Sequence, residues 1–353
     1  MKGLILAGGR GTRLRPITYT SAKQLVPVAN KPILFYGIEA LAESGIREIG
    51  IVVGDTKREI MEAVGNGARF GVTVTYIEQE APLGLAHAVL VSEPYLGADP
   101  FVMYLGDNLI REKLAALVRR FGEERPNAQI LLARVPNAQQ FGVAELADGK
   151  VVRLVEKPKV PTSDLALVGV YMFDRTVFEA VKAIKPSARG ELEITDAIQW
   201  LIDAGRTVHP HVIDGWWKDT GKLEDLLEAN RLILDTLEAR VEGEVEASEI
   251  HGKVIVAVGA KVVKSVIRGP AIIGKGATIE NAYIGPFTAV GDQVVIRSSE
   301  VEHSIILEGS SISDVVGRIE SSLVGRNVTI YRSGSKPKSY NLMLGDRSQV
   351  GLV

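Results

Sequence analysis

Glycines and arginines of the kind that hold phosphates cluster at the start of the chain. Residues 3–7 form an apolar run short enough to be one buried strand of a parallel sheet. Gly8, Gly9 and Gly11 follow it directly, and glycines let backbone N–H groups approach an anionic ligand closely. Three arginines of the same stretch carry a charge that does not titrate: Arg10, Arg13 and Arg15. The stretch predicts a phosphate-binding turn at a strand end; the alternative interpretation is a flexible turn with solvated arginines.

This turn differs from the two common phosphate-binding loops. Leu14 stands where the dinucleotide-binding fingerprint has its third glycine. No Gly-Lys-Ser/Thr sequence follows, which excludes the P-loop. Glycine spacing alone has many chance matches, so the identity of the ligand depends on the residues that accompany the turn.

Charged residues follow three other predicted strands. Asp107 comes directly after the apolar run 101–105, and Asp219 lies between a strand and a long helix. An isolated aspartate at a strand end is most often a cap or turn former. Two that open toward the glycine turn, however, offer the hard oxygen ligands that Mg²⁺ prefers beside bound phosphates. The third cluster, Glu156 and Lys157, places opposite charges side by side.

The apolar pattern places these residues on an α/β domain. Strands and helices alternate up to about residue 173, which predicts a mostly parallel sheet with helices on both faces and ligands at the carboxyl ends of its strands. Its second half is more antiparallel, because Asp148-Gly149 is a strong hairpin signal. The predicted strands are 3–7, 49–53, 72–77, 101–105, 128–135, 142–146, 151–155, 166–173 and 207–213. The predicted helices are 33–44, 59–64, 84–92, 112–122, 194–204 and a long bridging helix at 222–240.

The pattern changes after residue 240, where short β-rich pieces recur about every six residues. Such a period is typical of a parallel β-helix, in which each coil buries its apolar residues against the next. The repeated apolar positions are Ile273, Ile279, Ile284, Val290 and Ile296. We expect the repeats to decay after Val301, with a last coil at 325–330 and a capping tail at 331–353. The sequence therefore predicts two domains, 1–240 and 241–353.

Composition narrows the function classes. The length of 353 residues fits two domains, and a net charge of −2 gives no bulk basic field for nucleic acid or an anionic membrane. We find no apolar run near twenty residues and no signal peptide, so we expect no membrane association. With no cysteine, disulfides and thiolate-zinc sites are impossible, and a cytoplasmic location is the expectation.

A family resemblance identifies the ligand of the turn. The pattern Leu6-Ala-Gly-Gly-x-Gly-Thr-Arg-Leu-x-Pro16, with Ser21-Ala-Lys-Gln-Leu-Val-Pro27 and Asn30-Lys-Pro32 after it, resembles the signature of the sugar-1-phosphate nucleotidylyltransferases. The Lys23-Gln24-Leu25 segment is similar to the branch that uses dTTP and glucose 1-phosphate. The resemblance implies a Rossmann-like mixed sheet followed by a small left-handed β-helix. The left-handedness comes from the resemblance alone, because crossovers are ordinarily right-handed.

The resemblance also implies residue roles. Asp107 and Asp219 hold Mg²⁺, Arg13 grips the leaving pyrophosphate, Lys23 steadies the phosphates, and Lys157 meets the sugar phosphate. The implied nucleotide-binding residues are Leu6, Gly8, Gly9, Gly11, Thr12, Gln24, Gln79, Pro82 and Gly84. The implied sugar-phosphate-binding residues are Gly142, Glu156, Lys157 and Val170. Gln79 is the expected base reader because an amide can donate and accept at once; otherwise it is a surface polar residue.

The implied reaction is attack of the sugar phosphate on the α-phosphorus of dTTP, which gives dTDP-glucose and pyrophosphate. UTP is an alternative substrate, since one methyl group supports only about 1–3 kcal/mol of discrimination. A second alternative adds acyl transfer in the β-helix, with His251 or His303 as the catalytic histidine. A third is a non-catalytic sugar-nucleotide sensor. We expect a homo-oligomer to whose assembly the β-helix contributes.

Overall fold

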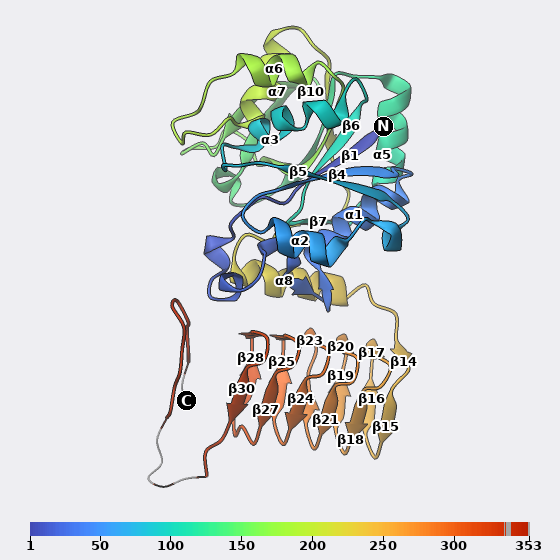
Figure 1. The fold of residues 1–353 in the computed structure, drawn as a ribbon, viewed down its shortest axis with the longest axis vertical. Helices are drawn as coiled ribbons and strands as arrows, with labels where there is room; N and C mark the ends of the chain where they lie inside the picture. The colour runs from blue at the N-terminus through green and yellow to red at the C-terminus, as the bar shows by residue number, and fades with distance from the viewer. Residues whose placement is uncertain (335, 337–339, 352–353) are drawn as a thin grey trace. The chain divides into compact units, whose positions relative to one another are not determined.

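The computed structural model describes residues 1–334, 336 and 340–351, which form two compact units (Figure 1). The N-terminal unit contains Met1–Arg10, Ser21–Leu25 and Ile33–Asp219. The C-terminal unit contains Gly11–Thr20, Val26–Pro32 and the described part of Thr220–Val353. The predicted domain boundary after residue 240 stays a prediction, because compact units of a folded chain need not coincide with domains that fold separately.

A mixed sheet lies at the centre of the N-terminal unit. Its strands are β1 (Lys2–Leu6), β4 (Glu48–Val53), β5 (Thr73–Glu78), β6 (Phe101–Leu105), β8 (Ala128–Arg134), β9 (Gly142–Ala147), β10 (Lys150–Glu156), β11 (Leu165–Phe173) and β12 (Val208–Val212). The main path runs β10-β9-β11-β6-β1-β4-β5, while β8 pairs with β11 and β12. The strands β6, β1, β4 and β5 are parallel, and β11 is antiparallel to β6. The predicted α/β class with a Rossmann-like mixed sheet is confirmed.

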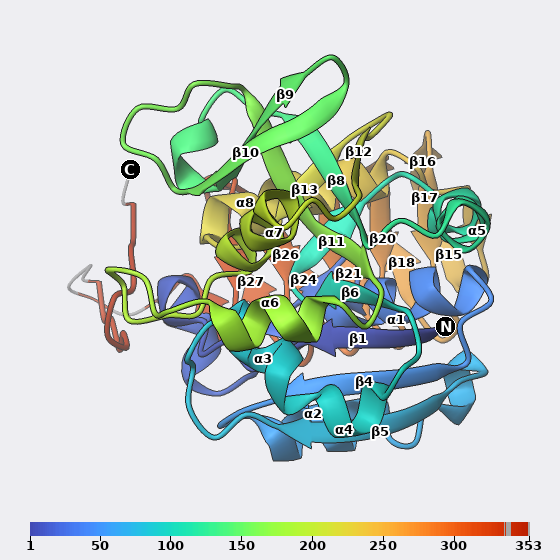
Figure 2. The same cartoon turned by 90° about the horizontal axis from the view of Figure 1, so that it is seen from above.

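Helices cover both faces of this sheet (Figure 2). They are α1 (Ile33–Glu43), α2 (Lys57–Val64), α3 (Leu85–Val91), α4 (Glu93–Leu96), α5 (Leu114–Glu124), α6 (Val177–Ala183) and α7 (Ile194–Asp203). Successive side chains of a strand point to opposite faces. Accordingly, Leu4 and Leu6 of β1 pack in one core with α3, α6 and α7, whereas Ile5 packs in a second core with α1, α2 and α5. A strand buried on both faces must be apolar at every position, which is why β1 reads as a continuous apolar run.

The predicted elements of this unit lie within two residues of the observed ones at both ends. The helices α4 and α6 were not predicted. Across the part of the chain that the structure describes, no helix is both long and apolar enough to cross a membrane.

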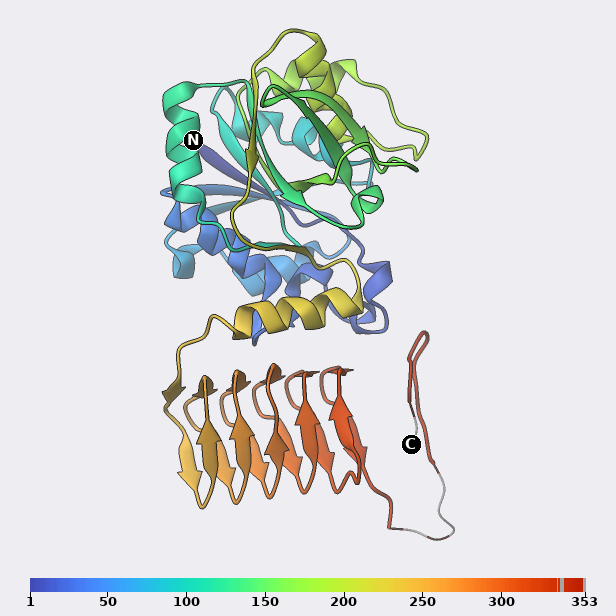
Figure 3. The same cartoon turned by 180° about the vertical axis from the view of Figure 1, so that it is seen from behind.

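Three parallel sheets make up most of the C-terminal unit, and Figure 3 shows their coils side by side. The strands are β14 (Arg240–Val241), β15 (Glu244–Glu246), β16 (Glu249–His251), β17 (Val254–Val256), β18 (Lys261–Val263), β19 (Val266–Arg268), β20 (Ala271–Ile273), β21 (Thr278–Glu280), β22 (Tyr283–Ile284), β23 (Thr288–Val290), β24 (Val295–Arg297), β25 (Glu300–Glu302), β26 (Ile305–Ile306), β27 (Ser311–Ser313), β28 (Arg318–Glu320), β29 (Leu323–Val324) and β30 (Thr329–Tyr331). Val254 pairs with Ala271, and Ala271 pairs with Thr288 one coil later. This stacking confirms the predicted parallel β-helix and is consistent with the left-handed form.

The predicted decay of the repeats after Val301 is wrong, because regular coils continue to Tyr331. The later coils keep buried apolar residues such as Ile306 and Ile312, and a serine closes one corner of early and late coils alike. The Ser304 hydroxyl donates to the carbonyl of Glu302 at 2.7 Å and accepts from the Ser322 amide at 3.0 Å. These hydrogen bonds satisfy the backbone at the corner, so the fold persists where the sequence period fades. Residues 335, 337–339 and 352–353 of the predicted capping tail lie outside the described residues.

The predicted bridging helix 222–240 is shorter than expected. The observed helix is α8 (Leu223–Leu234). It ends because the Thr236 amide and hydroxyl both bond to the carbonyl of Ile233, at 3.0 and 2.7 Å, which replaces the ordinary helical bond with a tight turn. Asn230 of α8 is fully buried; its side chain accepts from the Ala29 amide and donates to the carbonyl of Phe287, both at 2.9 Å. It thereby joins three distant segments of the C-terminal unit.

Candidate functional site

The carboxyl ends of the parallel strands bring three predicted site segments to one edge of the sheet. Leu6, the last residue of β1, pairs with Val52 of β4 and with Leu105 of β6. The Gly106 amide donates to the carbonyl of Leu6 at 2.9 Å, so the residue before Asp107 is bonded to the last residue of β1, two residues before Gly8. Gln79 follows β5, and its backbone N–H donates to the carbonyl of Val53 at 2.9 Å. Ligands of open α/β sheets bind along such an edge.

The backbone passes closely enough at this edge to require glycine. A Cβ on Gly54 would lie 3.1 Å from the carbonyl oxygen of Gly8, and one on Gly106 would lie 3.0 Å from that of Leu6. Side chains are therefore excluded from the floor of the edge, where main-chain groups are available to a phosphate. Arg10 forms an exposed ion pair with Asp55 at 2.8 Å.

The second half of the glycine turn belongs to the C-terminal unit. Gly11 has a left-handed φ of 63°, and its carbonyl accepts a hydrogen bond from the Thr18 hydroxyl at 2.7 Å. Leu14, which breaks the dinucleotide fingerprint, is fully buried and anchors the turn. Thr12 and Arg13 are exposed. The nucleotide roles of Gly11, Thr12 and Arg13 stay predictions.

Lys23 and Asp107 form a partly buried ion pair at the end of β6. Lys23 lies in the short 3-10 turn Lys23–Leu25, which is held in place because the Ala22 amide donates to the Glu59 carboxylate at 2.6 Å. Burial by itself raises the pKa of Asp107. The Lys23 ammonium and the hydrogen bonds that the carboxylate accepts from Lys23 and Asn108 outweigh burial and hold that pKa below its usual range. Asp107 is therefore a permanent anion at neutral pH.

Asp219 lies near Asp107 because a short antiparallel pair of strands places it there. The strand β13 (Trp217–Asp219) pairs with β7 (Asn108–Ile110), and Asp219 lies opposite Asn108. The Asn108 side chain donates to the Asp107 carboxylate at 2.9 Å and accepts from the Trp217 indole N–H at 2.6 Å. Two acidic residues that are far apart in sequence are thus presented at neighbouring positions, and Asn108 and Trp217 fix the orientation of one of them.

The donor set fits a magnesium ion that shares its coordination with phosphates. Asp107 and Asp219 offer hard carboxylate oxygens, and the lowered pKa of Asp107 keeps one of them ionised. Among the residues that the structure describes, no group of three or more acidic or histidine side chains could enclose a metal. Mg²⁺ commonly uses one or two carboxylates and takes its other ligands from water and substrate phosphates.

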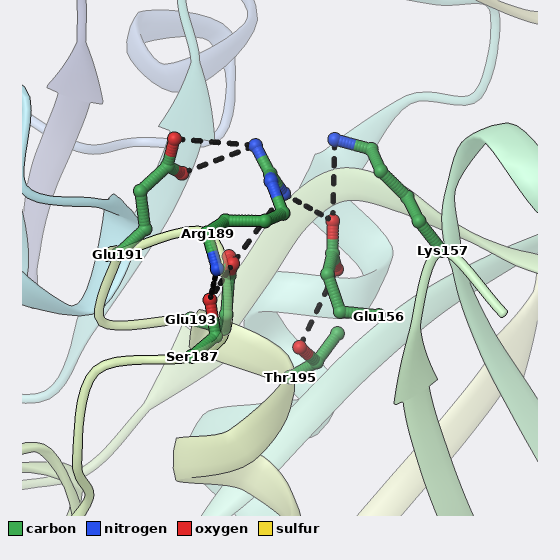
Figure 4. A network of polar contacts seen from close by, with 7 residues as sticks. All are labelled: Glu156, Lys157, Ser187, Arg189, Glu191, Glu193 and Thr195. Carbon is green, nitrogen blue, oxygen red and sulfur yellow. Dashed lines mark hydrogen bonds and ion pairs between the residues drawn. The ribbon is translucent and has the colours of Figure 1, made fainter.

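A second cluster, drawn in Figure 4, contains two of the predicted sugar-phosphate residues, Glu156 and Lys157. Glu156, at the end of β10, lies 3.3 Å from the Lys157 ammonium and 3.4 Å from the Arg189 guanidinium, and the Thr195 hydroxyl donates to it at 3.4 Å. Burial raises the pKa of Glu156; the cations Lys157 and Arg189 oppose this rise, and the neighbouring Glu193 carboxylate adds to it. Arg189 was not predicted, because its loop carries no motif.

Gly142 and Phe141 connect this cluster to the acidic pair. A Cβ on Gly142 would lie 2.6 Å from the Thr195 methyl group and 3.1 Å from the Glu156 carboxylate, so only glycine fits. The Lys157 amide donates to the carbonyl of Phe141 at 3.0 Å, and the Phe141 ring contacts Trp217 edge-on at 5.0 Å between centroids. Trp217 therefore touches both halves of the site. It lies in a segment that the sequence singled out only for its aspartate.

Val170, in contrast, is fully buried in β11 opposite Tyr104, so its side chain is not available to a ligand. Its predicted sugar contact could come only from its backbone. The backbone of the neighbouring Gly169 passes close to the Asn108 side chain, because a Cβ on Gly169 would lie 2.7 Å from the Asn108 side-chain oxygen.

The predicted base-reading residues lie together beside the glycine turn. The Gln79 side-chain nitrogen lies 3.2 Å from the carbonyl of Gly84 and 3.0 Å from His87 Nδ1. The side-chain oxygen of Gln79 faces Gly8, 3.5 Å from where a Cβ on that residue would lie. Pro82 is in the same loop. An open cavity of about 570 Å³ adjoins Gln79 on the side of α2, and its lining is mostly charged.

Gln24 is the remaining predicted nucleotide residue. Its side-chain nitrogen lies 3.5 Å from where a Cβ on Gly9 would lie. Within the described part of the chain, its side-chain oxygen is buried and has no hydrogen-bond partner. A buried acceptor without a partner is uncommon, and the nucleotide role of Gln24 beside the glycine turn stays a prediction.

We expect Gly84→Ala to disturb the base-reading loop. Gly84 has a φ of 105°, and an added Cβ would lie 2.4 Å from the backbone carbonyl oxygen of Leu192. The backbone segments at Gly84 and Leu192 can move apart only at a cost in free energy. The free energy of unfolding should therefore fall by about 1–3 kcal/mol, and KM for the nucleotide should rise about tenfold. Thermal unfolding and nucleotide titration measure both. Gly122→Ala is the matched control, since that helical glycine has free space around its Cβ; an equal loss there would contradict the steric argument.

Comparisons with known proteins show which family the chain belongs to. Residues 2–236 match the family model described as nucleotidyl transferase. The chain is 57% identical, over 99% of both chains, to a glucose-1-phosphate thymidylyltransferase of Streptomyces griseus, and 58% identical, again over 99% of both chains, to one of Streptomyces antibioticus. A Bacillus anthracis protein provisionally assigned as a glucose-1-phosphate thymidylyltransferase and crystallised with sucrose aligns with a TM-score of 0.64 and 38% identity; the alignment covers 68% of this chain and 98% of that one.

Proposed function

Because the chain belongs to the nucleotidyl transferase family, we propose that it transfers a thymidylyl group from dTTP to glucose 1-phosphate, giving dTDP-glucose and pyrophosphate. The observation that carries the proposal is the arrangement at the sheet edge. An acidic pair with its lysine, a glycine floor and a Lys157–Glu156 cluster lie on one connected set of elements. Two polyanions need such cationic and metal-binding groups around them in order to meet.

The chemistry requires no protein nucleophile and no general base. An oxygen of the sugar phosphate, already an anion, forms a bond to the α-phosphorus of dTTP while the bond to the bridging oxygen breaks and pyrophosphate leaves with its electron pair. Lys23 and Arg13 offset charge on the triphosphate, and Lys157 offsets charge on the sugar phosphate. Glu156 accepts hydroxyl hydrogen bonds from the sugar. The enzyme's contribution is alignment and preorganised charge.

We also propose that Asp107 and Asp219 hold a magnesium ion together with the triphosphate. When bound, Mg²⁺ supplies Lewis-acid stabilisation of phosphoryl charge. Before it binds, the Lys23 ammonium compensates the partly buried Asp107 carboxylate, which would otherwise be an unpaired, partly buried charge. Asn108 and Trp217 keep that carboxylate aimed at the sheet edge.

The direct test is pyrophosphate release from dTTP with Mg²⁺ and a panel of sugar 1-phosphates. Release with glucose 1-phosphate, dependent on both substrates, supports the proposal, and hydrolysis of dTTP without a sugar requirement contradicts it. Running dTTP and UTP side by side at low concentration decides between the two pyrimidine substrates, because one methyl group gives modest discrimination.

The alternative acyltransferase activity has less support. His251 is exposed and lies 3.1 Å from Glu249, whereas His303 Nε2 is buried and, among the described residues, has no hydrogen-bond partner. A buried ring nitrogen cannot take a proton from a substrate hydroxyl or amine. Coenzyme A turnover on an amino-sugar phosphate would overturn this preference. Turnover in the pyrophosphate assay would exclude the non-catalytic sensor.

We further propose a cytoplasmic homo-oligomer in which the β-helix contributes to assembly. Large apolar side chains are exposed along the coils, including Val241, Val245, Val258 and Val316. Light scattering of the intact chain, compared with a variant carrying Val258→Lys and Val316→Lys, tests this; an unchanged mass that corresponds to a monomer in both would contradict it.

Activity should depend on pH through Glu156. Because burial raises its pKa, this carboxylate becomes protonated at a higher pH than an ordinary glutamate, and the acceptor for sugar hydroxyls is lost as pH falls. We expect kcat/KM for glucose 1-phosphate to decline on the acid side. In Glu156→Gln the value at neutral pH should be about tenfold lower, and the acid limb should be flatter.

The phosphate group of glucose 1-phosphate also titrates, with a second pKa of about 6. Since that contribution is common to both proteins, the difference between the two pH profiles isolates Glu156. Parallel profiles would show that this carboxylate does not govern sugar binding.

A further inference from the structure

The C-terminal segment, residues 340–351, reaches the second half of the glycine turn. The Arg347 guanidinium donates a hydrogen bond to the carbonyl of Thr12 at 3.5 Å, and both residues belong to the C-terminal unit. In the same unit, Ile17 lies 3.7 Å from where a Cβ on Gly325 of the last β-helix coil would lie. The end of the chain and the glycine turn are therefore neighbours within one compact unit.

Arginines without matching acids gather at this place. Arg10, at the start of the turn, pairs with Asp55. Arg13 and Arg347, in contrast, are both exposed, and within the part of the chain that the structure describes no carboxylate forms an ion pair with either, including that of Asp346. Like charges close together repel each other, and a bound anion removes this repulsion. The pair of cations is therefore suited to a polyanion.

The backbone that presents Arg347 is strained. Arg347 has a left-handed φ of 64°, in a turn where the Ser348 amide donates to the carbonyl of Gly345 at 3.4 Å. This conformation is unfavourable for a residue with a side chain. The segment is not placed by a hydrophobic core, since Met343 and Leu344 are 91% and 55% exposed. A strained turn outside any core is consistent with a functional requirement for the arginine side chain.

We propose that Arg347 is a further binding residue for the phosphates of the nucleoside triphosphate that leave as pyrophosphate. This inference rests on the proposed function, in which Arg13, the residue after Thr12, offsets charge on the same triphosphate. A guanidinium carries five N–H donors in a planar fork, and the Thr12 carbonyl accepts from one of them. The remaining donors bind phosphate oxygens in charge-assisted hydrogen bonds. The C-terminal segment thereby completes the triphosphate site.

A purely structural role for Arg347 has to be distinguished from this one. If Arg347 only fastens the C-terminal segment to the turn, a neutral side-chain amide can donate the same hydrogen bond to the Thr12 carbonyl. A neutral amide cannot offset the charge of a phosphate, however. Replacement by glutamine therefore separates the two roles, and replacement by lysine restores the charge without the planar fork. A phosphate-binding role also predicts that the effect depends on which phosphates the ligand carries.

The test measures Kd of dTTP, pyrophosphate and dTMP by calorimetry with Mg²⁺ present. Arg347→Gln should bind dTTP and pyrophosphate about tenfold more weakly, the lower end of the range for a hydrogen bond to a charged group, because the site is exposed. Its Kd for dTMP, which lacks the leaving phosphates, should be unchanged. Arg347→Lys should recover most of the affinity. Arg332→Gln is the matched control, on an exposed arginine directly after β30, and should change none of the three Kd values.

An unchanged Kd of pyrophosphate in Arg347→Gln would overturn the inference, as would an equal weakening of dTMP binding. The calorimetric measurements need no turnover, so they test Arg347 even if the proposed reaction fails. Failure of the reaction itself would appear as a wild-type protein that binds dTTP and pyrophosphate but releases no pyrophosphate from dTTP and glucose 1-phosphate.

Discussion

Replacing Asp107 with alanine should lower turnover by about a hundredfold or more. This carboxylate is the one that Lys23, Asn108 and, through Asn108, Trp217 all orient, and its pKa is held low. Loss of a preorganised charge partner at a site of phosphoryl transfer typically has an effect of this size. The substitution also leaves the Lys23 ammonium buried without its counter-ion, so part of the loss comes from a displaced lysine.

The measurement is kcat for pyrophosphate release across a range of Mg²⁺ concentrations. Asp107→Asn keeps the size and the hydrogen bond from Asn108, so it should fold normally and still show most of the loss. Asp164→Ala is the matched control, because that aspartate is exposed and pairs with Arg134 at the surface. Near-normal turnover in a folded Asp107→Ala protein would show that the site is elsewhere.

Removing the Lys157 side chain should raise KM for glucose 1-phosphate by about 10- to 100-fold, the range expected for losing a hydrogen bond to a charged group. Lys157 has a left-handed φ of 43°, an unfavourable conformation for a residue with a side chain. The hydrogen bond from its amide to Phe141 and the ladder of β10 hold it there. Strain of this kind at a binding position is consistent with a functional requirement for the ammonium group.

The left-handed backbone at Lys157 allows a variant that separates the effect on stability from the effect on sugar-phosphate binding. Lys157→Gly relieves the strain, so the free energy of unfolding should stay level or rise while sugar-phosphate affinity falls. Lys157→Met keeps the length without the charge. Lys150→Met, on an exposed residue at the start of β10, the strand that ends just before Lys157, is the control. If KM is unchanged in both Lys157 variants, another cation binds the sugar phosphate.

Most of the N-terminal unit could be predicted because residue type there matches the local environment: buried strands are apolar, and turns contain turn-forming residues. The strand β1 is apolar throughout since Leu4 and Ile5 face different helical layers, and turn residues such as Asp148-Gly149 separate the strands. The positions of Asp107 and Gln79 followed from the rule that parallel strands end at one edge. Local pattern and tertiary position agree at these places.

The sequence could not predict what depends on pairing between distant segments. Nothing near Asn108 shows that it accepts a hydrogen bond from Trp217, and nothing near Arg189 shows that it contacts Glu156. Asn230 reads as an ordinary helix residue although it joins three segments. The late coils were missed because their period is irregular: stacked partners are 17 residues apart at Val254 and Ala271 but 18 apart at Ile305 and Leu323.

The central claim is that Asp107 and Asp219 act on one magnesium-loaded triphosphate. A double-mutant cycle tests it most directly, with kcat/KM for dTTP measured for Asp107→Asn, Asp219→Asn and the double variant at fixed Mg²⁺. If both carboxylates hold the same metal, kcat/KM of the double variant should be no more than about tenfold below that of the less active single variant. The first substitution already impairs metal binding, so the second has little further effect. Losses that multiply, as they should for Asp107→Asn combined with the surface substitution Asp164→Ala, would contradict the claim.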